Sequence, residues 1–190
     1  MVYYLCLYLE MERKMADSNL TKKALARALK ELMQEKAFEK ISISDICERC
    51  QMNRKSFYYH FIDKYDLVNW IFDTEFIVTV QQTLHGESWE VIIAMSELLY
   101  NNRAFYKKAL MIQGQNSFSE HFHEMLFSII STRFEGLMDL ERGHDFQTRF
   151  YTDALVMAYK NWIIEDAEMT PDVFLEEIRG CLRIVKEKDI

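Results

Sequence analysis

The scarcity of glycine and proline restricts the fold of this chain more than any other sequence feature. The 190 residues include 5 glycines and 1 proline, about a quarter of the combined usage of roughly 12% in average proteins. Tight turns between strands depend on these residues, so an all-β fold is excluded. The motifs G-x-G-x-x-G and G-x-x-x-x-G-K-[ST] are also absent, which excludes Rossmann and P-loop nucleotide-binding enzymes.

The rest of the composition is that of a globular protein. Hydrophobic residues make up 49% and charged residues 28% of the chain, unlike a disordered chain. No apolar run reaches the ~18 residues of a membrane span. Residues 1–9 lack the features of a signal peptide, and we interpret residues 1–14 as an upstream extension before Met15. We therefore expect a cytoplasmic protein whose four cysteines are reduced thiols.

Charge is distributed unevenly along the chain, whose formal net charge is −7. Residues 20–64 contain ten basic and six acidic side chains, whereas residues 65–190 contain eleven basic and twenty-one acidic ones. A basic N-terminal region on an acidic body suggests that only the first region meets a polyanion. A chance fluctuation over 45 residues is the alternative explanation.

Apolar spacing predicts short helices near the N-terminus. Residues 20–36 carry apolar side chains three and four positions apart, as on one face of an amphipathic helix. Ser42 and Asp45 resemble a capping box that begins a second helix. Asn53 is a good N-cap for a third helix over residues 54–60. Two short helices joined by a turn of about three residues are typical of a helix-turn-helix.

Longer helices are predicted for the remainder, beginning with one capped by Asp63 and ending with one that starts at Pro171. The expected fold is all-α, with an N-terminal three-helix helix-turn-helix domain followed by a domain of longer helices. We divide the chain into an N-terminal extension (1–19, disordered or from a misassigned start), a helix-turn-helix domain (20–66) and a second helical domain (67–190).

Residues 53–61, NRKSFYYHF, carry the chemistry of the predicted third helix. Phe57 and Phe61 are four positions apart and are expected to face the core. The polar residues between them suit DNA, because Arg and Lys reach guanine O6 and N7 and hydroxyls, His and Lys suit phosphate oxygens. A solvated polar face is the alternative. The candidates, including two helix starts able to hold phosphates, are Ser42, Asn53, Arg54, Lys55, Ser56, Tyr58, Tyr59, His60 and Lys64.

Residues 41–68 resemble the DNA-binding head of TetR-family transcription regulators. Gln51 departs from the family pattern, which has Gly in the turn; a positive φ would strain Gln there. The matching positions are Ser42, Ile46, Cys47, Cys50, Phe57, Tyr58, His60, Phe61, Lys64 and Leu67.

The resemblance also implies roles and an assembly. It implies a DNA-binding domain over residues 20–66 and a regulatory, dimerisation and sensor domain over residues 67–190. It also implies a homodimer whose two heads read successive major grooves of a near-palindromic site. By position it places Arg54, Lys55, Ser56 and Tyr59 at base edges and Ser42, Tyr58, His60 and Lys64 at the DNA backbone, with Ser44 able to do either.

Residues 102–118 and the helix ending at Trp162 are similar to one TetR branch, which includes the DhaS-like regulators of dihydroxyacetone-kinase operons. That resemblance implies an activator controlled by a separate ligand-binding partner protein. Control by a small-molecule effector is our first expectation, and a helical interaction protein without DNA binding is a remote alternative.

Catalytic and metal chemistry find little support. Cys47 and Cys50 have no second cysteine pair, so small-residue packing is favoured over zinc. His121 and His123 are two apart, which separates their rings on a helix. No nucleophile motif occurs. We expect no metal, no cofactor and no enzyme activity.

Aromatic and aliphatic side chains of the body supply candidates for two further sites, although packing in the core is the commoner role of such residues. A sensor pocket would be lined by apolar residues with a few polar groups; its candidates are Phe105, Phe118, Phe122, Met125, Tyr151 and Trp162. The last two helices are the expected dimer interface by family resemblance, through a stripe of Leu155, Ala158, Trp162, Phe174, Ile178 and Leu182; intramolecular packing of this stripe is the alternative.

Overall fold

The computed structural model describes residues 15–83, 88–114, 116–133, 144–165 and 168–186. All regular structure in these ranges is helical, which confirms the predicted fold class. The chain divides into two compact units between Ile71 and Phe72. None of the helices described has the length and apolar character that crossing a bilayer demands.

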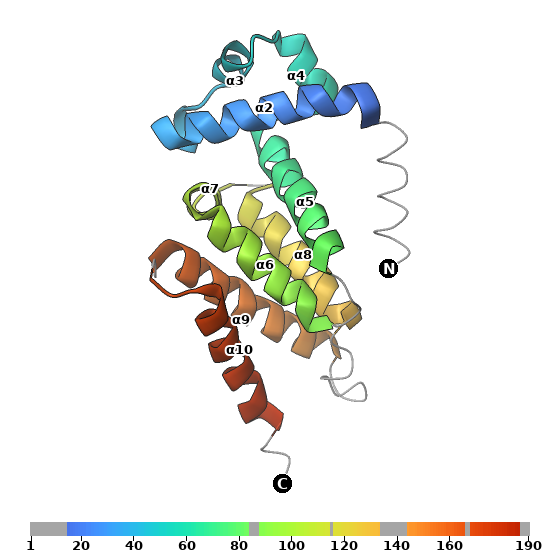
Figure 1. Cartoon of the computed structure of the whole chain (residues 1–190), viewed down its shortest axis with the longest axis vertical. Helices are drawn as coiled ribbons and strands as arrows, with labels where there is room; N and C mark the ends of the chain where they lie inside the picture. The colour runs from blue at the N-terminus through green and yellow to red at the C-terminus, as the bar shows by residue number, and fades with distance from the viewer. Residues whose placement is uncertain (1–14, 84–87, 115, 134–143, 166–167, 187–190) are drawn as a thin grey trace. The chain divides into compact units, whose positions relative to one another are not determined.

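The N-terminal unit is built on helix α2, Met15–Glu35. Helix α2 begins five residues before the expected start at residue 20, so residues 15–19 of the expected extension are helical; residues 1–14 lie outside the described residues. The short 3-10 helix η1 (Phe38–Lys40) leads into α3 (Ile43–Arg49), and α4 (Arg54–His60) follows after residues 50–53. Helices α3 and α4 pack against each other and both against α2 (Figure 1).

The turn between α3 and α4 contains the residue that departs from the family pattern. The N–H of Met52 donates to the carbonyl of Cys47 at 2.8 Å, and the N–H of Gln51 donates to that of Glu48 at 3.1 Å. These two bonds form a Schellman motif, whose C′ residue is left-handed. Gln51 occupies that position with φ 58°, so a side chain stands where glycine would be unstrained.

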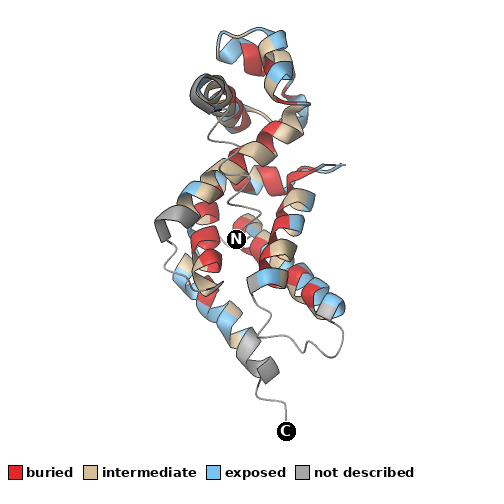
Figure 2. Ribbon diagram, turned by 90° about the vertical axis from the view of Figure 1, so that its right-hand side faces the viewer, coloured by how far each residue is buried: buried red, intermediate tan, exposed pale blue. Residues whose placement is uncertain are grey.

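The C-terminal unit begins within α5 (Lys64–Thr83) and continues with α6 (Ser88–Asn101), α7 (Arg103–Leu110), α8 (Phe118–Arg133), α9 (His144–Glu165) and α10 (Pro171–Lys186). Helix α8 packs along α9, and α10 along α6. Within this unit the buried residues gather on the helix faces that meet other helices (Figure 2).

Aromatic rings fill the core of the C-terminal unit. The ring of Phe72 lies 5.1 Å from that of Phe118 and 5.8 Å from that of Phe122. Tyr106 is fully buried, and its hydroxyl donates to Glu75 Oε2 at 2.6 Å. Burial raises the pKa of Tyr106, so the phenol stays protonated and keeps this donor role.

Replacing Gln51 by Gly should stabilise the protein. Glycine adopts positive φ without the penalty of about 1–2 kcal/mol that a Cβ imposes, although its greater freedom in the unfolded chain offsets about 0.5–1 kcal/mol. We expect a net gain of up to about 1 kcal/mol in the free energy of unfolding, measured by urea denaturation. Gln51→Ala keeps the Cβ and should give no gain; an equal gain from Ala and Gly would contradict the backbone explanation.

Candidate nucleic-acid interface

Helix α4 has one buried edge and one exposed face. Phe57 is fully buried and Phe61 is 3% exposed, with their ring centroids 5.8 Å apart. Since these two side chains face the core, the residues between them face outward. Tyr58 is 58% and Tyr59 81% exposed, which is unusual for aromatic side chains that have no partner surface.

The start of α4 is fixed by its N-cap. Asn53 Oδ1 accepts the backbone N–H of Ser56 at 2.8 Å and the Ser56 hydroxyl at 3.2 Å. Asn53 has extended backbone, so the chain enters the helix abruptly. The cap uses the proton of the Ser56 hydroxyl, which leaves that oxygen as an acceptor for a base or a phosphate-bound water.

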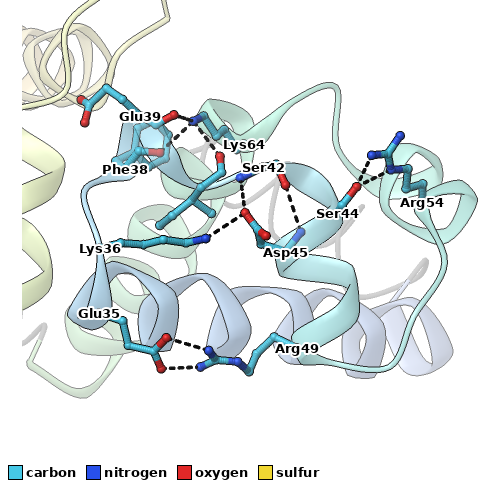
Figure 3. A network of polar contacts seen from close by, with 11 residues as sticks. Glu35, Lys36, Phe38, Glu39, Ser42, Ser44, Asp45, Arg49, Arg54 and Lys64 are labelled. Atoms are coloured by element: carbon cyan, nitrogen blue, oxygen red, sulfur yellow. Dashed lines mark hydrogen bonds and ion pairs between the residues drawn. The ribbon is translucent and has the colours of Figure 1, made fainter.

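Arg54 is tied to the preceding helix. Its Nε donates to Ser44 Oγ at 2.6 Å, and its Nη2 also donates to that oxygen. Ser44 lies in the first turn of α3, so this contact joins the two helices of the helix-turn-helix across their exposed edge (Figure 3). The guanidinium is held in one direction while part of its donor fork stays available. Ser44 therefore orients Arg54.

A polar network sets the position of α3. Ser42 and Asp45 form the predicted capping box: Asp45 N–H donates to Ser42 Oγ at 3.1 Å, and Ser42 N–H donates to Asp45 Oδ2 at 2.8 Å. Lys36 also donates to Asp45 Oδ2, at 2.9 Å. At the other end of α3, Arg49 makes a two-pronged contact with Glu35, with bonds of 2.9 and 2.8 Å (Figure 3). Helix α3 is thus held at both ends: Lys36, which follows α2, bonds to its start, and Glu35, the last residue of α2, bonds to its end.

His60 closes α4 as a neutral side chain. Burial first, and then the positive charge of Lys22, lower the pKa of His60 below 6.5, so the imidazole is uncharged at neutral pH. A neutral imidazole can donate one hydrogen bond and accept another. It adds no positive charge to the surface, so on α4 itself the exposed positive charges are those of Arg54 and Lys55.

Lys64 is placed differently from the other candidates. Its Nζ donates to the backbone carbonyls of Phe38 at 2.8 Å and Ile41 at 2.9 Å, with a longer contact of 3.4 Å to that of Glu39. No sequence signal distinguishes such a lysine from one on the surface, because its acceptors are backbone atoms 23 to 26 residues away. The Lys36–Asp45 and Arg49–Glu35 pairs were likewise missed by sequence reasoning.

Cys47 in α3 and Cys50 at its C-cap are packing residues in this geometry. Cys47 is buried, and the Cys50 thiol donates to the carbonyl of Ile46 at 3.2 Å. Burial raises the pKa of both thiols, which disfavours the thiolate that metal binding needs. Among the described residues, no group of three or more His, Cys, Asp or Glu side chains gathers as metal ligands would.

The residues expected to line a sensor pocket lie in the packed core of the C-terminal unit, with one exception. Tyr151 is only half-buried. Phe118 and Phe122 contact the Phe72 ring, and Trp162 stacks on Phe174 with centroids 4.1 Å apart. The buried members of this set are Phe105, Phe118, Phe122, Met125 and Trp162.

The residues expected at a dimer interface differ in their burial. Trp162 and Phe174 are buried against each other within one chain. Leu155, Ala158 and Ile178 are half-buried, and the side chain of Leu182 lies outside the described residues. Different apolar side chains of the last two helices are exposed: Phe146 by 74%, Phe150 by 58%, Met157 by 53% and Val173 by 46%.

Two family models match the chain. One describes bacterial regulatory proteins of the tetR family and covers residues 25–71; the other describes a transcriptional regulator C-terminal region and covers residues 87–183. Among curated proteins, the chain is 33% identical over 109 residues to the HTH-type dhaKLM operon transcriptional activator DhaS of Lactococcus lactis. That match spans 57% of this chain and 57% of the relative, little more than half the length of each.

Solved structures share the fold. The dihydroxyacetone kinase operon activator DhaS superposes with a TM-score of 0.65 at 24% identity, covering 87% of this chain and 95% of that one. A transcriptional regulator from Aquifex aeolicus gives 0.55 at 20% identity, covering 87% and 99%. NalD, a secondary repressor of a multidrug efflux pump in Pseudomonas aeruginosa, gives 0.54 at 16% identity, covering 89% and 96%.

Replacing Arg54 or Lys55 by Ala should relax sequence preference, at a cost of about 1–3 kcal/mol on the preferred site if the residue contacts a base. Ser44→Ala should weaken preference at the base pair that Arg54 reads, because the guanidinium loses its orienting partner. Competition binding on single-base variants of the site measures both effects. Lys107→Ala removes an exposed charge from α7 and is the control. Unchanged preference in all three head variants would remove these residues from base readout.

Asp45 should make stability depend on pH in the acid range. The Ser42 N–H first, and then Lys36, lower the pKa of Asp45 from 3.8 to about 2. A lowered pKa means that the contribution is present above pH 3.8 and disappears as pH falls towards about 2. Asp45→Asn should therefore be less stable than wild type at neutral pH, with a difference that closes over that window. Thermal unfolding across pH measures this, with Glu48→Gln as control. A pH-independent difference would contradict the assignment.

Proposed function

Because the chain belongs to the TetR family of bacterial transcription regulators, we propose that it acts in the cytoplasm as a homodimer that reads a near-palindromic operator with α4. The exposed polar face of α4, opposite the buried Phe57 and Phe61, is the observation that carries this proposal. A seven-residue helix with an exposed Arg, Lys and two Tyr fits a major groove.

Within that proposal, some candidate residues contact base edges and the others contact phosphates. Arg54 and Lys55 lie at the start of α4, the end from which recognition helices contact base edges. Tyr59, the most exposed of the aromatic side chains on α4, and Ser56 extend the same face. Three groups are assigned to phosphate oxygens: Ser42 before α3, the Tyr58 hydroxyl and the His60 imidazole. Phosphate contacts fix the register of the protein on the duplex without reading its sequence.

The charge distribution supports contact through the N-terminal unit alone. The excess of basic residues lies within 20–64, whereas residues 65–190 carry an excess of acidic ones. An acidic body repels the phosphate backbone, so the field of the protein favours encounters in which the N-terminal unit approaches the duplex. This charge asymmetry suits a regulator that binds one short site rather than a protein that coats DNA.

For the homodimer, we assign the interface to the exposed apolar stripe of α9 rather than to the stripe that the family resemblance led us to expect on the last two helices. Phe146, Phe150 and Met157 follow one another by four and seven positions, so they share one face of α9. The rings of Phe146 and Phe150 are stacked at 6.5 Å. Val173 on α10 is exposed as well. Four such side chains left in water favour burial against a second copy, as in a four-helix contact.

Control of the protein has two candidate forms, a small-molecule effector and a partner protein. Phe118, Phe122 and Trp162, three of the predicted pocket residues, pack ring to ring in the core. This packing favours a signal received at the surface of the C-terminal unit. In either form the signal would shift a two-state equilibrium that sets whether both heads dock at once.

Selection of a random duplex library against the purified protein tests the proposed function. The expected result is a near-palindrome with half-sites about one helical turn apart, because two identical heads read the same sequence. Failure of a folded dimer to enrich any sequence would contradict autonomous operator binding. Repeating the selection with cell extract separates the two remaining cases: recovery of a palindrome identifies a partner-dependent regulator, and continued failure indicates an interaction protein.

Phe150→Glu should dissociate the dimer, because it places a charge at the centre of the proposed apolar contact. The dimer dissociation constant should rise by at least about thirtyfold, the factor that corresponds to a hot-spot loss of about 2 kcal/mol. Sedimentation velocity over a concentration series measures the constant. Met111→Glu is the matched control, since Met111 is also exposed, by 57%, but follows α7. Equal effects of the two substitutions would contradict the assigned interface.

A further inference from the structure

The ammonium group of Lys64 is enclosed by backbone oxygen. Its bonds to the carbonyls of Phe38 and Ile41 are 2.8 and 2.9 Å long, and the carbonyl of Glu39 lies at 3.4 Å. The Phe38 ring covers the group from another side, with its centroid 4.3 Å from Nζ. An ammonium has three N–H donors, and three carbonyls surround this one. Lys64 thus satisfies its donors inside the protein.

These contacts join two places that bracket the helix-turn-helix. Phe38 and Ile41 lie in and just after η1, immediately before Ser42, the N-cap of α3. Lys64 is the first residue of α5, and three residues separate it from the end of α4. One side chain therefore connects the segment that enters α3 to the segment that leaves α4 (Figure 3).

We propose that Lys64 is a positioning residue for DNA binding, which holds the start of α3 in register with α4 and makes no phosphate contact of its own. This replaces the backbone-contact role that the family resemblance implies for it.

Exchange of these carbonyls for a phosphate would be unfavourable. Leaving the site would deprive part-buried carbonyls of a charge-assisted bond, and such bonds contribute more than neutral ones. It would also remove the cation from the face of the Phe38 ring. Burial lowers the pKa of Lys64, while the carboxylates of Glu39 and Asp63 act in the opposite direction. The carboxylates help to retain the charged form in its place.

Loss of the Lys64 contacts should weaken DNA binding, because fewer molecules would hold α3 and α4 in the arrangement that binds DNA. Without the ammonium, the segment before Ser42 is free to take other positions. Apparent affinity falls in proportion to the fraction of molecules in which α3 and α4 are correctly placed. The number of phosphates neutralised in the bound state does not change, because Lys64 contributes none of them.

The salt dependence of binding separates the two roles. Lys64→Met keeps the length of the stem and removes the charge; Lys55→Met removes a charge from the exposed face of α4; Lys107→Met removes one from α7. Binding is measured on a fluorescent duplex across a salt series, at a temperature where circular dichroism shows every variant to be folded. A random-sequence duplex serves as well as a selected operator, so this result does not depend on the operator or on the dimer interface.

We expect Lys64→Met to bind about tenfold more weakly, as for the loss of about 1.4 kcal/mol, with the wild-type slope of log affinity against log salt. Loss of a phosphate contact would flatten that slope by about 0.9. Lys107→Met should match wild type. A flatter slope for Lys64→Met, or wild-type affinity, would overturn the proposal.

Side-chain NMR of the lysine ammonium groups supplies a readout that a loss of stability would not mimic. Bonded ammonium groups exchange slowly enough for detection, and the Lys64 signal is assigned by its absence in Lys64→Met. We expect this signal in the free protein and an unchanged position after saturation with duplex. A shift of the Lys64 signal on DNA binding would show a phosphate contact and overturn the proposal.

Discussion

Burial of Phe57 and Phe61 is the constraint on which the proposed DNA-binding surface depends. Each ring contributes about 1.5–3 kcal/mol when taken out of water. Phe57 lies within α4, a helix of only seven residues, and Phe61 is its C-cap. A helix this short has little stability of its own, so packing of these two rings decides both that α4 exists and how it is turned. Once the two rings face inward, Arg54, Lys55 and Tyr59 lie on the exposed face of α4.

Polar contacts then decide where α3 lies relative to α4. The capping box of Ser42 and Asp45 also receives Lys36, and the two-pronged bond of Arg49 to Glu35 fixes the opposite end. Exposed ion pairs of this kind stabilise little individually. Their effect here is geometric, because they restrict a short helix at both ends. The left-handed Gln51 then sets the turn that brings the start of α4 beside Ser44.

The C-terminal unit follows a different design. Its core is a run of contacting aromatic rings, which close-pack through edge-to-face and stacked contacts. The same packing that uses Trp162 and Phe174 internally leaves Phe146, Phe150 and Met157 uncovered on α9. The unit therefore has a close-packed aromatic interior and an uncovered apolar stripe on α9, which fits the dimer interface that we propose there.

The sequence by itself determined the helical class, the bounds of α4 and the two rings that orient it. These properties depend on local signals: few turn residues, a periodicity of 3.6 and caps within three residues of their partners. It also indicated the capping box at Ser42. Only the tertiary structure decided the backbone acceptors of Lys64, the partner of Arg54 and the exposed face of α9. Each of these depends on atoms brought together from positions distant in the chain, and periodicity reports that a face is apolar without reporting which neighbour covers it.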